Sequence, residues 1–141
     1  MLVYVCRHAR AAPGEPDELR PLTPEGRDDA RRLARRLAAE ARPPAVVLSS
    51  PLLRARQTAG EIAQATGAEL RVEHRLSPGA TAEDLRAAVE DAVSPVATVG
   101  HQPDCSEIAL ALTGSDPGFP PAGMAAISCF VHGALFGGVC A

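Results

Sequence analysis

The sequence predicts an α/β fold, a three-layer α/β/α sandwich with a mostly parallel central sheet. Short apolar runs, typical of buried strands, alternate with segments of helical periodicity that carry helix-capping signals. Hydrophobic residues make up 46% of the chain but aromatic residues only 3%, so the core must consist of Ala, Val, Leu and Ile. Such a core suits helices that pack closely on a sheet.

The first strand is the apolar run that ends at Arg7-His8. A polar, proline-rich loop from Arg10 to Pro21 follows it and is long enough to border a pocket. Thr23-Pro24-Glu25 then predicts the start of a helix, because Thr is a good N-cap and Pro needs no amide partner in the first turn. Pro43-Pro44 ends this helix.

The second strand, Ala45–Leu48, leads directly into a second helix. Ser50 is expected to be its N-cap and Pro51 its first residue, and Gly67 its stop. Because this helix begins at the carboxyl end of a strand, we expect Arg54 to project toward Arg7-His8, near the positive end of the helix dipole.

The remaining elements continue the alternation. Thr81 and Asp84 have the spacing of a capping box, and His101 comes, like His8, just past a strand. The predicted elements are an edge strand at Glu69–Val72, a helix from Thr81, a central strand at Val96–Val99, a helix from about Asp104 to Gly114, and tail strands at Ala125–Val131 and Leu135–Val139.

The length and composition of the chain exclude several classes of function. The 141 residues fit a single domain, residues 1–141, without an internal repeat or a linker. A net charge of −3 argues against nucleic acid or an acidic membrane as the main partner. All 14 basic residues are Arg, which excludes a Schiff-base lysine and a P-loop lysine.

The cysteine spacing and the lengths of the apolar runs argue against metal-binding, redox and membrane-spanning proteins. The four cysteines form no C-x-x-C pair, so neither a metal site nor a redox motif is expected, and nothing in the sequence calls for a cofactor. The chain opens without a cationic region before an apolar stretch, and no apolar run approaches the length that spans a membrane. We therefore expect a cytoplasmic protein.

Three strand-to-loop junctions are predicted to deliver Arg7 and His8, Arg54, and His101 to one pocket. Two imidazoles and two guanidiniums, with no carboxylate among them, suit a tetrahedral dianion. A neutral histidine is a nitrogen nucleophile near pH 7, so this set favours phosphoryl transfer through a covalent phosphohistidine. For each residue alone, a surface salt bridge or an ordinary loop position is the alternative.

These residues stand in motifs that resemble the histidine phosphatase superfamily. Its Arg-His-Gly signature appears as Arg7-His8-Ala9, and its Ser-Pro-Leu-x-Arg-Ala-x-Gln-Thr element as Ser50–Thr58. Pro21–Gly26 and the segment Val99–Pro103, with the second histidine, also match in order. The resemblance covers nearly the whole chain and implies a phosphoglycerate mutase-like fold.

The resemblance also implies roles for the four residues. His8 would be the nucleophile that becomes phosphorylated, Arg7 and Arg54 would clamp phosphoryl oxygens, and His101 would bind and stabilise the transferring group. Arg20 and Ser50 are further candidates at the rim or behind the site, where a structural role also explains them.

The sequence departs from the family pattern at two positions. Ala9 replaces the signature glycine, and an alanine would be strained there if the position required a positive φ. Pro78 stands where many members of the superfamily carry a glutamate that acts as general acid, and a proline cannot protonate a leaving group. Glu73 and His74 are possible substitutes, although a surface position flanking a strand also explains both.

A site without a general acid favours a substrate with a good leaving group. An imidazole leaves more readily than an alkoxide, so a phosphohistidine on a partner protein is the expected substrate, and the short chain also resembles the SixA-type branch. One alternative is a general phosphomonoesterase or sugar-phosphate phosphatase of the same superfamily, with a small phosphorylated substrate. Another alternative is an inactive module that binds phosphorylated partners. Ala9 is the only residue that points to it.

Overall fold

A six-stranded sheet forms the centre of the molecule. A computed structural model describes residues 1–128 and 138–140. The sheet order is β3-β2-β4-β1-β5-β6; β1 to β4 run parallel, β5 runs antiparallel to β1, and β6 antiparallel to β5. The strands are β1 (Leu2–Arg7), β2 (Val46–Ser49), β3 (Glu69–Val72), β4 (Val96–Gly100), β5 (Met124–Ser128) and β6 (Gly138–Cys140). The predicted mostly parallel sheet is confirmed.

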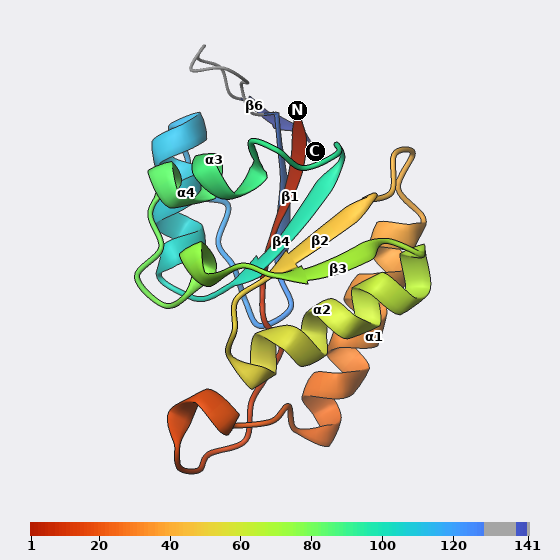
Figure 1. Cartoon of the computed structure of the whole chain (residues 1–141), viewed down its shortest axis with the longest axis vertical. Helices are drawn as coiled ribbons and strands as arrows, with labels where there is room; N and C mark the ends of the chain where they lie inside the picture. Colours follow the sequence, from red (N-terminus) through yellow and green to blue (C-terminus); the bar gives the residue numbers. More distant parts are fainter. Residues whose placement is uncertain (129–137, 141) are drawn as a thin grey trace.

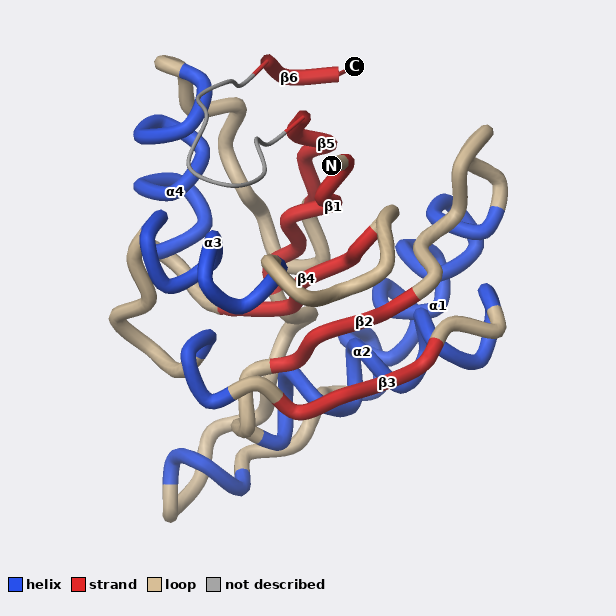
Figure 2. Tube along the Cα trace, turned by 45° about the horizontal axis from the view of Figure 1, so that its top comes forward, coloured by secondary structure: helices blue, strands red, loops and turns tan. Residues whose placement is uncertain are grey.

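Helices cover both faces of this sheet, which confirms the three-layer sandwich (Figures 1 and 2). The helices are α1 (Pro24–Ala38), α2 (Leu53–Thr66), α3 (Ala82–Val89) and α4 (Asp104–Thr113), with short 3₁₀ turns η1 (Asp17–Leu19) and η2 (His74–Leu76). None of the helices in the described part of the chain has the length and apolar character needed to cross a bilayer.

Alternation along β1 explains the two layers of the core. Val3 and Val5 belong to the apolar cluster under α3 and α4, whereas Tyr4 and Cys6 belong to the cluster under α1 and α2. Successive side chains of a strand point to opposite faces, so a strand that is apolar throughout is buried on both sides. In Figure 2, α1 and α2 lie on one side of the sheet and α3 and α4 on the other.

Two predicted helix starts are confirmed in detail. The Thr23 hydroxyl accepts a hydrogen bond from the Gly26 amide, 2.9 Å away, with Pro24 as the first helical residue. In α3, the Asp84 amide donates to the Thr81 hydroxyl and the Thr81 amide donates to the Asp84 carboxylate, which is a complete capping box.

The predicted start of the second helix is wrong. Helix α2 begins at Leu53 rather than Pro51, and Leu52 occupies its N-cap position without a side-chain cap. The hydroxyl of Ser50, which we expected to cap the helix, is 2.7 Å from a ring nitrogen of His101 instead. A Ser-Pro pair has the pattern of a helix start, but a tertiary contact uses this serine.

The tail is described only in part. The predicted strand at Ala125–Val131 corresponds to β5, Met124–Ser128, and its last three positions lie outside the described residues. Of the predicted strand Leu135–Val139, positions 135–137 also lie outside them, and β6 spans Gly138–Cys140.

Gly26 is predicted to be intolerant of a side chain. A Cβ added there would overlap the carbonyl oxygen of Arg10 and lie 3.0 Å from its carbonyl carbon. Backbone atoms cannot move aside cheaply, so we expect Gly26→Ala to lower the free energy of unfolding by about 1–3 kcal/mol in denaturant titrations.

Gly60 is the matched control, since it is a helical glycine in α2 with no atom within 4 Å of an added Cβ. Gly60→Ala should raise the free energy of unfolding by about 0.5–1 kcal/mol, because alanine loses less backbone entropy in a helix. Equal stability of the two variants would contradict the close packing of α1 against the loop after β1.

Candidate active site

The carboxyl ends of β1, β2 and β4 meet at one edge of the sheet. The parallel register pairs Arg7 with Gly100 and Ser49 with Val99. The His8 amide continues this ladder by donating to the Gly100 carbonyl at 3.0 Å, and the Ser50 amide donates to the Val99 carbonyl at 3.0 Å. The residues that follow the three strands, His8, Ser50 and His101, are thereby held side by side.

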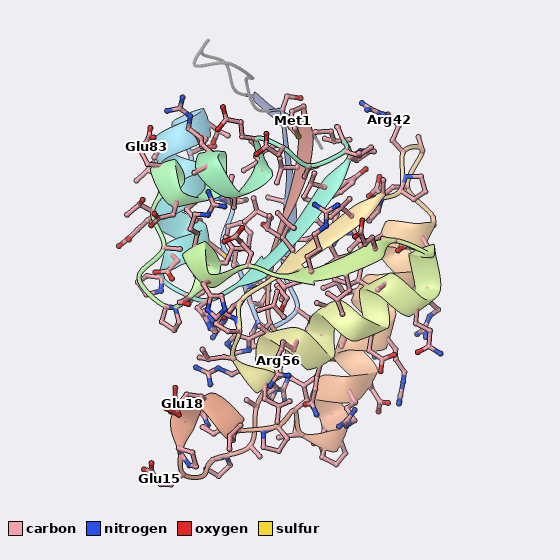
Figure 3. All side chains as sticks on the ribbon, viewed as in Figure 1. Met1, Glu15, Glu18, Arg42, Arg56 and Glu83 are labelled. Atoms are coloured by element: carbon pink, nitrogen blue, oxygen red, sulfur yellow. The ribbon has the colours of Figure 1, made fainter. Side chains whose placement is uncertain are left out.

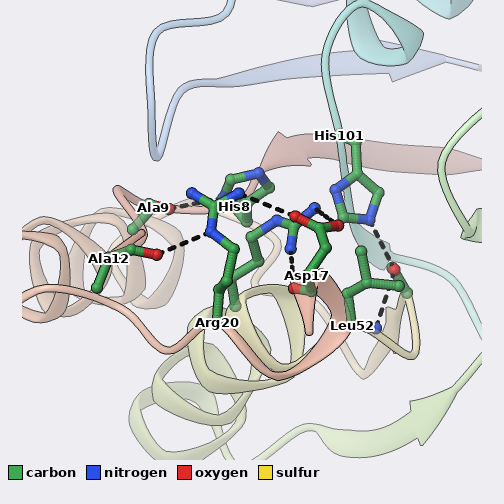
Figure 4. Close-up of polar contacts among 9 residues, drawn as sticks. His8, Ala9, Ala12, Asp17, Arg20, Leu52 and His101 are labelled. Carbon is green, nitrogen blue, oxygen red and sulfur yellow. Dashed lines mark hydrogen bonds and ion pairs between the residues drawn. The ribbon is translucent and has the colours of Figure 1, made fainter. Parts of the chain in front are cut away.

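The two histidines face each other within this edge (Figure 4). The ring centroids of His8 and His101 are 5.2 Å apart, and the ring planes are inclined by 59°. His101 is buried, whereas His8 is partly exposed. The structure thus brings together the two imidazoles that the sequence separates by most of the chain.

The backbone of Ala9 fixes the protonation of His8. The His8 Nδ1 lies 2.6 Å from the Ala9 carbonyl oxygen, and a carbonyl can only accept, so Nδ1 carries the proton and Nε2 keeps its lone pair. Burial lowers the pKa of His8 to about 4, and the guanidiniums of Arg54, Arg7 and Arg20 add to this, whereas the Ala9 carbonyl opposes it. At neutral pH the ring is therefore neutral and nucleophilic at Nε2.

Ser50 holds the second histidine. Its Oγ lies 2.7 Å from the His101 Nε2 and also accepts a hydrogen bond from the Leu52 amide at 3.3 Å. Burial lowers the pKa of His101 to about 4, and the nearby His8 and Arg54 lower it further, while the Asp17 carboxylate acts in the opposite direction. The structure places Ser50 behind His101, where it orients the ring.

Two guanidiniums flank the histidines. Arg7, at the end of β1, donates from Nη1 to the Phe119 carbonyl oxygen at 3.0 Å. Its Nε is buried and has no hydrogen-bond partner among the described residues, an arrangement that is costly unless a ligand satisfies it. Arg54, on the first turn of α2, is 7% exposed and reaches the same region.

Asp17 is a carboxylate that the sequence-based prediction of the site missed. Its Oδ2 is 3.2 Å from Arg54 Nη2, its backbone carbonyl accepts from Arg54 Nη1 at 2.9 Å, and its Oδ1 is 3.0 Å from Arg20 Nη1. Hydrogen bonds from Arg20 and Arg54 lower the pKa of Asp17. The expected site without a carboxylate is therefore corrected to one with a carboxylate between two guanidiniums.

Arg20 supports the loop that carries Asp17. Its Nε donates to the Ala12 carbonyl at 2.8 Å, and its Nη1 pairs with Asp17 across one turn (Figure 4). This pairing at i, i+3 was the one sequence signal that could have located Asp17. Arg20 thus lies at the rim, and its contacts are with the loop.

The alanine at position 9 is unstrained. Ala122 is the only residue other than glycine with a positive φ in the described part of the chain, so Ala9 does not require the freedom of a glycine. The Ala9 amide donates to the Thr58 hydroxyl at 3.0 Å, which in turn donates to the Arg54 carbonyl at 2.9 Å. The substitution therefore leaves the backbone beside His8 tied to α2.

The segment with Pro78 contains no carboxylate that is free for the site. The Glu73 carboxylate accepts hydrogen bonds from the Arg75 amide and from Arg75 Nε, each at 3.0 Å. His74 is exposed. The loop after η2 is anchored elsewhere, since the amides of Gly79 and Ala80 donate to the buried Asp104 carboxylate.

Comparison with known proteins identifies the family. The model of the histidine phosphatase superfamily, branch 1, matches residues 3–94, which is more than half of the chain. The chain belongs to the histidine phosphatase superfamily. This confirms the resemblance read from the Arg7-His8-Ala9 and Ser50–Thr58 motifs. No curated protein sequence matches the chain.

Solved structures of SixA proteins are similar to this chain over nearly its whole length. The protein histidine phosphatase SixA, in complex with tungstate, is 28% identical with a TM-score of 0.81, covering 92% of this chain and 88% of that one. A protein from Agrobacterium tumefaciens described as a phosphohistidine phosphatase SixA is 31% identical with a TM-score of 0.78, and 91% of each chain is covered.

A more distant likeness concerns the fold alone. A mycobacterial glucosyl-3-phosphoglycerate phosphatase is 18% identical with a TM-score of 0.69, covering 89% of both chains. The superfamily match and the SixA structures together confirm the phosphoglycerate mutase-like fold and support a phosphatase.

Proposed function

We propose that this protein removes phosphoryl groups from phosphohistidine on a partner protein, through a covalent phosphohistidine on His8. The observation that carries the proposal is the state of His8: Nδ1 is committed to the Ala9 carbonyl 2.6 Å away, so Nε2 is free to attack. Its ring centroid lies 5.2 Å from that of His101, and the guanidiniums of Arg54 and Arg7 are close enough for their charges to lower the pKa of His8.

Each remaining residue has a role in this proposal. Arg7, with its unpartnered Nε, and Arg54 bind the phosphoryl oxygens, and His101 binds the same group from the other side. The positive charges of the two arginines neutralise the developing charge on the phosphoryl oxygens, so the proposed reaction uses no metal ion and no cofactor. Ser50 and Arg20 act through His101 and Asp17 and do not touch the phosphoryl group.

The reaction has two steps. In the first, the His8 Nε2–phosphorus bond forms as the phosphorus–nitrogen bond of the substrate breaks, and the electron pair of the broken bond stays on the departing imidazole. In the second, water attacks phosphorus, the bond to Nε2 breaks, and inorganic phosphate leaves with one proton of the water while the other is released to solvent. The net change is hydrolysis of one phosphohistidine.

Two observations favour phosphohistidine over an ester. Pro78 occupies the position of the family's general acid, and Glu73 is engaged with Arg75, so an alkoxide leaving group finds no proton donor in this segment. The similar SixA structures are named as a protein histidine phosphatase and as a phosphohistidine phosphatase.

The test compares two substrates at equal enzyme concentration. We expect kcat/KM for a phosphohistidine peptide to exceed that for p-nitrophenyl phosphate and for a sugar phosphate. A Ser50→Ala variant would leave the His101 ring without the hydroxyl that orients it. We expect this variant to lose activity toward both the phosphohistidine peptide and the esters. Preference of the wild-type enzyme for the esters would instead establish a general phosphomonoesterase, and no turnover of either would favour a binding module.

A further inference from the structure

The ion pair between Asp17 and Arg54 joins an exposed carboxylate to a buried guanidinium. The Arg54 side chain is 9% exposed, whereas that of Asp17 is 58% exposed. Asp17 belongs to η1, the 3₁₀ turn in the loop between β1 and α1, which lies below the carboxyl end of β1 in Figure 1. A negative charge thus stands on the solvent side of the guanidinium that we assign to the phosphoryl group.

Figure 4 shows that this carboxylate is close to the reacting groups, between His101 and the Arg20 side chain. The Asp17 charge acts on the His101 ring, and both of its oxygens are held by guanidiniums, at 3.0 and 3.2 Å. Its position is therefore fixed from two sides. In an in-line transfer the leaving group departs on the side opposite the attacking His8. The Asp17 side chain, which is 58% exposed, stands on the solvent side of the site.

We propose that Asp17 is a specificity-determining residue, whose carboxylate favours substrates with a protonated imidazole as leaving group over substrates that release an alkoxide. This inference rests on the proposed function. The structure assigns to the site a fixed anion in place of the acid that the family pattern would supply.

The chemistry of the leaving group explains why an anion helps. A phosphohistidine ring that carries a proton on its second nitrogen bears a positive charge, and it departs as neutral imidazole when the phosphorus–nitrogen bond breaks. The unprotonated ring would have to depart as an anion, which is far less favourable. A carboxylate beside the ring stabilises the protonated form before bond cleavage, and by the same charge it opposes an alkoxide that gains negative charge.

Asp17 itself is unsuited to donate the proton. Hydrogen bonds from Arg20 and Arg54 lower the pKa of Asp17, so its carboxyl group is ionised at neutral pH. The proton must come with the substrate ring, and the two arginines keep the carboxylate in the charged form that attracts this ring. Arg54 thus binds both the phosphoryl group and the residue that selects its leaving group.

The decisive measurement is the ratio of kcat/KM for a phosphohistidine peptide to kcat/KM for a sugar phosphate, which releases an alkoxide. We expect Asp17→Asn, which removes the charge and keeps the shape, to lower this ratio about 3- to 5-fold, as for a charge that is largely exposed. The phosphohistidine activity should fall, and the ester activity should stay the same or rise, because the charge that opposes the alkoxide is gone.

Glu18 supplies the matched control. It is the next residue of η1 and points away from the chain in Figure 3, so Glu18→Gln removes the same charge from the same turn and should leave the ratio as in the wild type. Asp17→Glu keeps the carboxylate and should retain most of the ratio. If Asp17→Asn proves unstable in a thermal melt, Asp17→Ser and Asp17→Glu give the comparison between a neutral and a charged side chain.

The outcomes separate this inference from the proposed function. An equal fall of both activities in Asp17→Asn would mean that Asp17 only positions Arg54, and an unchanged ratio would mean that its charge has no effect; either overturns the inference. A wild-type enzyme that prefers the ester would overturn the proposed function, whatever the variants show.

Discussion

Replacement of His8 by Ala is expected to lower kcat/KM by on the order of 10³-fold or more with every phosphorylated substrate, because it removes the nucleophile from a two-step reaction. The loss should appear in kcat, since Arg7, Arg54 and His101 remain to bind the phosphoryl group. Steady-state kinetics with p-nitrophenyl phosphate and a phosphohistidine peptide would measure it. The Nδ1 of His8 is committed to the Ala9 carbonyl, which leaves the lone pair of Nε2 free to attack.

His74→Ala is the control for this experiment. His74 is an exposed histidine in η2, and its carbonyl, which the substitution retains, accepts hydrogen bonds from the Ser77 amide and hydroxyl. Its removal should leave kcat/KM within about twofold of the wild type, as for most surface substitutions. A His8→Ala protein that folds normally and retains a tenth of the wild-type activity would show that His8 is not the nucleophile.

Replacement of Arg54 by Ala is expected to lower kcat/KM by about 10²–10³-fold, the usual loss when a preorganised charge that stabilises a transition state is removed. The Arg54 guanidinium is buried in the site, and its positive charge lowers the pKa of both His8 and His101. Its loss also frees the Asp17 carboxylate, which would then repel the phosphoryl oxygens. Arg54→Lys should recover only part of the activity, because an ammonium cannot form the two parallel hydrogen bonds of a guanidinium.

Arg56→Ala offers the comparison on the same helix. Arg56 is exposed and donates from Nε to the Pro51 carbonyl at 2.9 Å. Its substitution removes the same charge two residues further along and should change kcat/KM by less than about threefold. Similar losses for the two variants would indicate that the overall positive charge, rather than the buried guanidinium, drives activity.

The sequence predicted the framework of the site because strand ends can be located from local signals. The apolar runs end at Arg7 and just before His101, and parallel strands place such ends at one edge of the sheet. The register Arg7↔Gly100 then brings the two histidines within 5.2 Å between ring centroids. Helix starts with an unambiguous cap, at Thr23 and Thr81, were also predicted correctly.

Contacts that depend on the path of a loop could not be predicted from the sequence. The pairing of Asp17 with Arg54 spans 37 residues and depends on how the loop after β1 folds over α2. Ser50 has the local pattern of a helix cap, but its hydroxyl meets His101 across 51 residues of sequence, and the helix starts at Leu53. Local propensity is overridden where a tertiary hydrogen bond uses the same side chain.

The covalent intermediate on His8 is the central claim, and trapping it is the most direct test. A single turnover of the wild-type protein with a radiolabelled phosphohistidine peptide would be quenched in alkali, digested, and searched by mass spectrometry for the labelled residue. We predict a phosphoryl group on His8 that is stable in alkali and lost in acid, and none in the His8→Ala protein. A label on His101 or any other residue, or full turnover without a labelled protein, would contradict the account.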